Sequence, residues 1–108
     1  MQARTKQRPR PRPISAAALE LVAGRFRALG QPLRLRLIQE LEGGEQSVSA
    51  LAEKIESTQP NVSKHLKVLD EAALLNRRQR GTNAYYAIAD RMVFGLCETT
   101  RNMLGWIS

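Results

Sequence analysis

The chain has 108 residues, of which 43% are hydrophobic and 25% charged, and its formal net charge is +7. This length suits one small domain, and a single cysteine excludes an intramolecular disulfide framework and fits a reducing cytoplasm. No run of residues approaches the ~18 apolar residues of a membrane span, so we expect a cytoplasmic protein without a membrane segment.

Residues 1–13 form a basic segment that ends in Arg-Pro-Arg-Pro-Arg-Pro. It holds five of the 17 lysine and arginine residues and no acid, so most of the excess positive charge belongs to it. Alternating prolines and the near absence of apolar side chains predict a disordered or polyproline-like arm. The arm could lie along phosphates or enter a minor groove, or it could be a solvated leader with only nonspecific effects.

Residues 14–108 are predicted to form one domain that begins with three helices. The first, over residues 15–29, has an apolar stripe and ends at Gly30. The second, over residues 32–42, begins at Pro32, buries its leucines and isoleucine, and directs Arg34 and Arg36 outward. The third is short, over residues 48–55, with Ser47 as its cap. The stripe of the first helix consists of Ala18, Leu19, Val22, Phe26 and Leu29.

Residues 58–69 are predicted to form a helix with two chemically distinct faces. Val62, Leu66 and Leu69 line an apolar face at helical spacing, and Thr58 can cap the start. The other face carries amides, a hydroxyl, cations and an imidazole, namely Gln59, Asn61, Ser63, Lys64, His65 and Lys67. Amides can pair with base edges and lysines can neutralise phosphates, so we predict that this face enters a DNA major groove. With the short helix before it, this helix makes a helix-turn-helix unit.

The spacing of the apolar residues changes from a helical to an alternating pattern after residue 74. Residues 75–80 and 82–88 are predicted to form a β-hairpin around Gly81, with Ala84, Tyr86 and Ile88 on one face. The hairpin carries a basic cluster, for which we predict contacts with the DNA backbone or minor groove, made of Arg77, Arg78 and Arg80. The expected fold is therefore mainly α with a small β-hairpin, a winged helix-turn-helix.

Residues 90–106 are again predicted to be helical, with Phe94 and Trp106 as additional apolar residues. The main stripe of this helix consists of Met92, Val93, Leu96, Cys97, Thr100, Met103 and Leu104. A core of three helices and a hairpin has little room for so much apolar surface, so the first and last helices are predicted to form a homodimer interface. Two-fold symmetry would place two recognition helices about 34–36 Å apart and implies a palindromic operator.

Three segments together resemble the ArsR/SmtB family of dimeric winged-helix repressors. They are residues 26–38 (FRALGQPLRLRLI), 62–69 (VSKHLKVL) and 80–86 (RGTNAYY), within a similarity that covers about residues 16–104. The resemblance implies four helices, a two-stranded wing and a fifth helix, with the first and last helices pairing in the dimer. It also implies operator binding that blocks transcription and is commonly relieved by an inducer, which the sequence does not identify.

The metal sites of this family are missing from the sequence. Many members bind metals through a Cys-x-Cys pair at the start of the third helix, where this chain has Ser47 and Ser49, which are poor ligands for soft ions. A second family site begins Asp-x-His, whereas this chain has Asp90-Arg91-Met92 and no histidine after His65. We therefore expect no metal and no other cofactor.

Three backbone positions also differ from the family pattern. Glu56 and Ala73 stand where the family usually has glycine, and each would cost about 1 kcal/mol or more if it kept a left-handed conformation. Alternatively, the two turns are locally redrawn. Gln31 replaces the usual acidic or amide cap before Pro32, which predicts a slightly weaker helix start.

His65 and Cys97 have alternative interpretations. For His65 we prefer a contact with a DNA phosphate or base, the alternatives being a pH switch or a plain surface residue. For Cys97 we prefer a small buried hydrophobic residue. The alternative is redox sensing by an intermolecular bridge or a sulfenate, against which the neighbouring Glu98 argues mildly.

The function indicated by the sequence is that of a homodimeric transcriptional repressor that binds double-stranded DNA. An enzyme is not expected, because the one histidine and the one cysteine lie on different predicted elements and no glycine-rich phosphate loop is present. The alternative is a winged-helix module that docks RNA or a protein through its wing and basic arm, without operator specificity.

Overall fold

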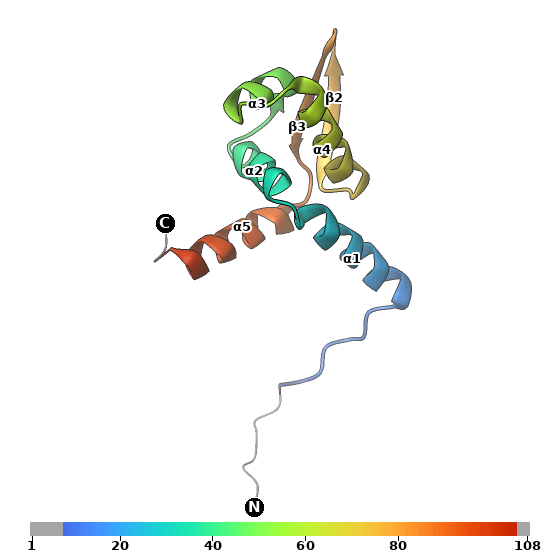
Figure 1. Ribbon diagram of the computed structural model, residues 1–108. Helices are drawn as coiled ribbons and strands as arrows, with labels where there is room; N and C mark the ends of the chain where they lie inside the picture. Colours follow the sequence, from blue (N-terminus) through green and yellow to red (C-terminus); the bar gives the residue numbers. More distant parts are fainter. Residues whose placement is uncertain (1–7, 106–108) are drawn as a thin grey trace, which may run out of the picture.

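The computed structural model describes residues 8–105, so the first seven residues of the basic arm and Trp106 lie outside the described part. Residues 8–13 are exposed and have no regular secondary structure. The elements, in chain order, are α1 (Ala16–Leu29), α2 (Pro32–Leu41), β1 (Gln46–Ser47), α3 (Val48–Lys54), α4 (Gln59–Glu71), β2 (Leu75–Arg80), β3 (Asn83–Ile88) and α5 (Arg91–Leu104) (Figure 1). This order confirms the mainly α winged helix-turn-helix that the sequence predicts.

Side-chain caps fix where the helices begin. Thr58 Oγ1 accepts a hydrogen bond from the Asn61 N–H at 3.2 Å, and Ser47 Oγ accepts one from the Ala50 N–H at 3.1 Å, as predicted. Gln31 also caps its helix. Its Oε1 folds back to accept a hydrogen bond from the Arg34 N–H at 2.9 Å, so the longer amide side chain still caps α2.

The hydrophobic core lies beneath the helix-turn-helix unit. Val62, Leu66 and Leu69 of α4 are all fully buried, which confirms the predicted apolar face. They pack with the buried face of α2, with α3, with the inner face of the sheet and with the start of α5. The other fully buried side chains are Leu37, Ile38, Leu41, Leu51, Leu74 and Val93.

The wing is part of a three-stranded antiparallel sheet, with strand order β1-β3-β2, rather than the two-stranded hairpin expected from the sequence. β1 has only two residues and pairs with β3, so that Gln46 lies opposite Tyr86. Two residues are too few to produce an alternating pattern, which is why this strand was missed. The alternation of β3 itself is confirmed, since Tyr86 is buried and Ala84 and Ile88 pack against the core.

Two non-glycine residues have left-handed backbones, so the turns keep their usual conformation and are not redrawn. Glu56 has φ 55° and Ala73 has φ 64°, at the ends of α3 and α4. In both places the following N–H bonds a carbonyl five residues back, from Ser57 to Ala52 at 2.9 Å and from Leu74 to Leu69 at 3.0 Å. These bonds close the helix ends in the way that favours glycine, so the fold imposes the strained conformation on the residues that stand there.

We expect Ala73→Gly to raise the free energy of unfolding by about 0.5–1 kcal/mol, because glycine removes the left-handed strain while adding some entropy to the unfolded chain. Ala72→Gly is the matched control, since Ala72 has φ −87° and gains nothing from glycine. It should lower the free energy of unfolding by a similar amount. Urea denaturation followed by circular dichroism measures both, and a destabilised Ala73→Gly protein would contradict the assigned strain.

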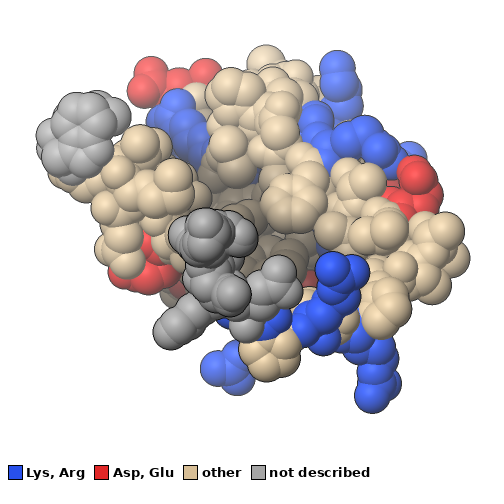
Figure 2. Space-filling model, turned by 90° about the horizontal axis from the view of Figure 1, so that it is seen from below, with Lys and Arg blue, Asp and Glu red and all other residues tan. Residues whose placement is uncertain are grey.

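Helices α1 and α5 extend away from the compact body on different sides (Figure 1). An ion pair between Arg25 and Asp90, at 3.2 Å, joins α1 to the start of α5. Much of their apolar surface stays exposed, and Figure 2 shows a largely uncharged surface on this underside of the molecule. Only Ala28 and Leu29 of α1 and Val93 of α5 are buried, so most of the two predicted stripes is not covered within the protomer.

Within residues 8–105, no helix is both long and apolar enough to cross a membrane.

Candidate nucleic-acid interface

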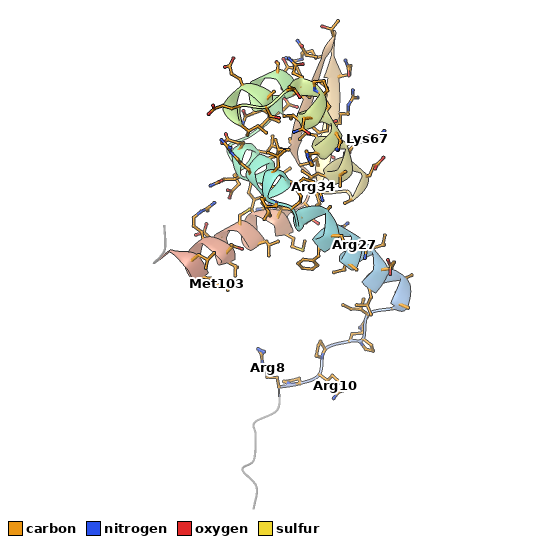
Figure 3. The ribbon with its side chains drawn as sticks, in the orientation of Figure 1. Arg8, Arg10, Arg27, Arg34, Lys67 and Met103 are labelled. Atoms are coloured by element: carbon orange, nitrogen blue, oxygen red, sulfur yellow. The ribbon has the colours of Figure 1, made fainter. Side chains whose placement is uncertain are left out.

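The predicted reading residues of α4 divide into two groups in the structure. Gln59, Ser63, Lys64 and Lys67 are exposed to solvent, and Figure 3 shows Lys67 on the outer side of α4. Asn61 and His65, four residues apart, lie on one flank of the helix and are partly buried. The buried stripe of α4 turns the first group outward, so a partner would meet an uninterrupted surface of amide, hydroxyl and ammonium groups.

Asn61 already has a partner within the helix-turn-helix turn. Its Nδ2 donates a hydrogen bond to Ser57 Oγ at 3.0 Å. This bond steadies the turn between α3 and α4. The amide nitrogen carries two N–H groups, so this bond leaves one N–H and the carbonyl oxygen free for a contact with a base edge.

His65 contacts an arginine that the sequence analysis placed outward. Arg34 folds back instead, so that its Nη1 lies 3.2 Å from His65 Nδ1 and its Nε donates to the carbonyl oxygen of Ala28 at 2.6 Å. Partial burial, and then the positive charges of Arg34 and Lys64, lower the pKa of His65 below its usual value near 6.5. The imidazole is therefore neutral at pH 7.

The wing arginines differ in their surroundings. Arg78 makes two hydrogen bonds to the Glu45 carboxylate, at 3.0 and 2.6 Å, and these bonds lower the pKa of Glu45. Arg77 donates to Gln79 Oε1 at 2.6 Å and has no acidic partner among residues 8–105. Arg80 lies on the same strand, also without an acidic partner in the described chain. Arg78 is therefore the wing arginine that forms an ion pair within residues 8–105, while Arg80 acts on the same carboxylate only through its charge.

Two residues near the wing arginines were missed by the sequence analysis. Tyr85 pairs with Arg78 in the β2–β3 register, and the guanidinium carbons of Arg78 and Arg80 lie 6.0 and 5.7 Å from its ring centre. The alternation of β3 could have placed Tyr85 on the outer face opposite Tyr86. Glu45 carried no such signal, because it lies 33 residues before its partner, in an irregular segment.

Ser47, Ser49 and Asp90, which the resemblance places at metal sites, make polar contacts here. Ser47 Oγ and Ser49 Oγ lie 3.2 Å apart, and both oxygens of Asp90 are engaged, with the Met92 N–H at 2.9 Å and with Arg25 at 3.2 Å. Over residues 8–105, no group of three or more histidine, cysteine, aspartate or glutamate side chains is placed to hold a metal ion.

Cys97 borders an apolar groove of about 390 Å³ between α2 and α5. Burial, and then the negative charge of Glu42, raise the pKa of its thiol, while Arg101 opposes the shift. These surroundings favour the protonated thiol, which is the less reactive form. The acid that acts on the thiol is thus Glu42 rather than the neighbouring Glu98, which bonds Arg101 at 3.3 Å.

Known proteins similar to this chain are DNA-binding regulators. A helix-turn-helix domain family model matches residues 29–78. An HTH-type transcriptional regulator of Methanocaldococcus jannaschii is 36% identical over 75 residues, which are 68% of this chain and 84% of the relative. The arsenical resistance operon repressor of Bacillus subtilis is 40% identical over 73 residues, which are 67% of this chain and 70% of the relative.

Two further similarities concern a longer relative and a solved structure. The HTH-type transcriptional repressor SmtB of Mycobacterium tuberculosis is 35% identical over 82 residues, which are 76% of this chain but only 58% of that protein. The solution structure of a homodimeric winged helix-turn-helix domain from Mycobacterium bovis, a possible ArsR-family regulator, superposes with a TM-score of 0.76. It is 31% identical, and the match covers 83% of each chain.

Proposed function

This chain belongs to the ArsR/SmtB family of winged helix-turn-helix transcriptional regulators, and we propose that it is a homodimeric repressor of a palindromic operator. We also propose that it does not sense metals through the usual sites of the family. The observation that carries the proposal is the outer surface of α4, where Gln59, Ser63, Lys64 and Lys67 are exposed and no carboxylate occurs in residues 58–69.

In this proposal the side chains divide into readers of bases and anchors of phosphates. Gln59, Asn61, Ser63 and His65 offer amide, hydroxyl or imidazole groups, which suit base edges in the major groove. The cations neutralise backbone charge and set the orientation of the protein on the duplex. The proposed anchors are Lys64, Lys67, Arg77, Arg78 and Arg80.

The proposed dimer forms through α1 and α5. Support comes from large apolar side chains that the protomer leaves open, among them Phe26 at 54% exposure, Leu19 at 52% and Leu104 at 47%. A two-fold axis through this surface would bring identical apolar faces together. The two α4 helices would then enter successive major grooves, about 34–36 Å apart, on one side of the duplex.

The absence of metal sensing is supported by what occupies the corresponding positions. Ser47 caps α3 and Asp90 caps α5, and a metal ion bound to either side chain would break its capping hydrogen bond. Hydroxyls in place of thiolates are weak ligands for zinc or arsenic(III). In this proposal, an inducer acts through a site other than these two.

The test is fluorescence anisotropy with the DNA upstream of the gene as the labelled duplex and a scrambled duplex as competitor. We expect tight, salt-sensitive binding of two protomers that survives the competitor and is not released by zinc or arsenite. Equal binding to both duplexes would favour the alternative of an RNA- or protein-docking module. Lys64→Ala should weaken operator binding, whereas Arg27→Ala, which removes the same charge from the distant α1, should not.

Glu45→Gln is expected to strengthen operator binding about two- to fivefold at low salt, because Arg78 would no longer have to leave a carboxylate to reach a phosphate. Glu20→Gln is the matched control, since Glu20 pairs with Arg27 at 3.1 Å on the exposed side of α1. The same anisotropy titration measures both variants. Weaker binding by Glu45→Gln would mean that Glu45 orients Arg78 for its DNA contact instead of competing with the phosphate.

A further inference from the structure

Arg34 joins three helices through one guanidinium group. It lies at the start of α2, where α2 meets the end of α1 and passes α4 (Figure 3). Its Nε bonds the buried Ala28 carbonyl at the end of α1, and its Nη1 contacts His65 on α4. Because the guanidinium is planar, the bond from Nε to the Ala28 carbonyl also fixes the position of Nη1.

The contact with Arg34 determines which nitrogen of the His65 ring carries the proton. A guanidinium only donates hydrogen bonds, so Nδ1, at 3.2 Å, must accept and is unprotonated. The neutral ring then carries its proton on Nε2. Nε2 has no hydrogen-bond partner among residues 8–105 and is the ring nitrogen left for a partner outside the protein.

We propose that Arg34 is a positioning residue for operator recognition, which holds His65 with Nε2–H as a donor to an acceptor on the DNA. The inference rests on the proposed function, since it assigns the way in which one reading side chain is oriented. The same guanidinium donates to the Ala28 carbonyl of α1, so the position of the His65 ring depends on the position of the end of α1. His65 is thus placed relative to the helix that we assign to the dimer interface.

The charges around the ring agree with this role. Arg34 of α2 and Lys64 of α4 are the charged groups that act on His65, and both favour its neutral form, as does its partial burial. A protonated ring could not accept from Arg34, so the contact and the neutral state support each other.

The test is a double-mutant cycle in the anisotropy assay, with Arg34→Gln, His65→Ala and the double variant, each checked for folding by thermal denaturation. We expect Arg34→Gln to weaken operator binding about tenfold when His65 is present and to have no further effect in the His65→Ala background. Arg36→Gln is the matched control, because Arg36 lies on the same helix and donates to the Lys54 carbonyl at 3.2 Å, away from His65. It should bind like the wild type.

A second measurement observes the His65 ring directly. The chain has one histidine, so a long-range ¹H–¹⁵N spectrum of the free protein reports the His65 ring alone. We expect the Nε2–H tautomer, and a shift toward the tautomer mixture of free imidazole in Arg34→Gln. The Nδ1–H tautomer in the wild type would overturn the inference whatever the variants do.

The remaining outcomes separate the inference from the proposed function. An equal loss in both backgrounds would assign Arg34 a structural role at the end of α1, and unchanged binding by His65→Ala would show that there is no contact to position. Either result overturns the inference while the repressor function stands. Equal wild-type binding to operator and scrambled duplexes would contradict the function itself, and the positioning role with it.

Discussion

Replacing Phe26 with glutamate is expected to convert the protein into monomers and to weaken operator binding by about 100-fold or more. Phe26 is 54% exposed on α1, and Leu19, two turns earlier on the same face, is 52% exposed. In a two-fold dimer the substitution is present in both protomers and places two carboxylates in an apolar contact. An unpaired buried carboxylate costs several kcal/mol. A monomer also engages one half-site at a time and loses the gain from linked binding. Light scattering after size exclusion and operator anisotropy measure the two effects.

Arg27→Glu is the matched control for this substitution. It introduces the same side chain at the next residue, where the native arginine is 66% exposed and forms an ion pair with Glu20. We expect this variant to remain dimeric and to bind the operator with nearly unchanged affinity. A dimeric Phe26→Glu protein would show that α1 does not form the interface and that its apolar face has another partner.

The recognition helix illustrates what the sequence predicts well. Val62, Leu66 and Leu69 recur at helical spacing, and a period repeated over several turns can be satisfied only by burying one face. All three are fully buried. The conformation of Glu56 and Ala73 was left open by the sequence, and the hydrogen bonds that close the ends of α3 and α4 decide for the left-handed one. Local rules therefore predicted the five helices, the β2–β3 hairpin and the outer face of α4, but not β1.

What the sequence did not predict depends on contacts between distant residues. Arg34 and His65 are 31 residues apart and Glu45 and Arg78 are 33 apart, and no local pattern links either pair. Both contacts involve residues predicted to bind DNA, because one fixes the His65 ring and the other pairs Arg78 with a carboxylate. The apolar stripes of α1 and α5 were visible in the sequence, but periodicity does not distinguish a face buried within a protomer from one covered by a second copy.

Truncating Leu66 to alanine is expected to lower the free energy of unfolding by about 3–5 kcal/mol. Leu66 is fully buried on the inner face of α4, which packs against α2, α3 and β2. Loss of its side chain removes apolar burial and leaves a cavity that the surrounding helices fill only in part. A domain of this size is stabilised by about 5–15 kcal/mol in total, so the loss is a large fraction. Urea denaturation at a fixed protein concentration measures it.

Leu35→Ala is the control, because Leu35 lies on α2 but is 49% exposed, and its truncation should cost about 1 kcal/mol or less. Equal losses for the two variants would contradict the assigned core. Under conditions where Leu66→Ala remains folded, it should bind the operator nearly normally, since Leu66 faces away from the DNA. Lys64→Ala should show the reverse, with normal stability and weak binding. These opposite outcomes at positions two residues apart would show that the buried face of α4 stabilises the fold and that its exposed face binds the operator.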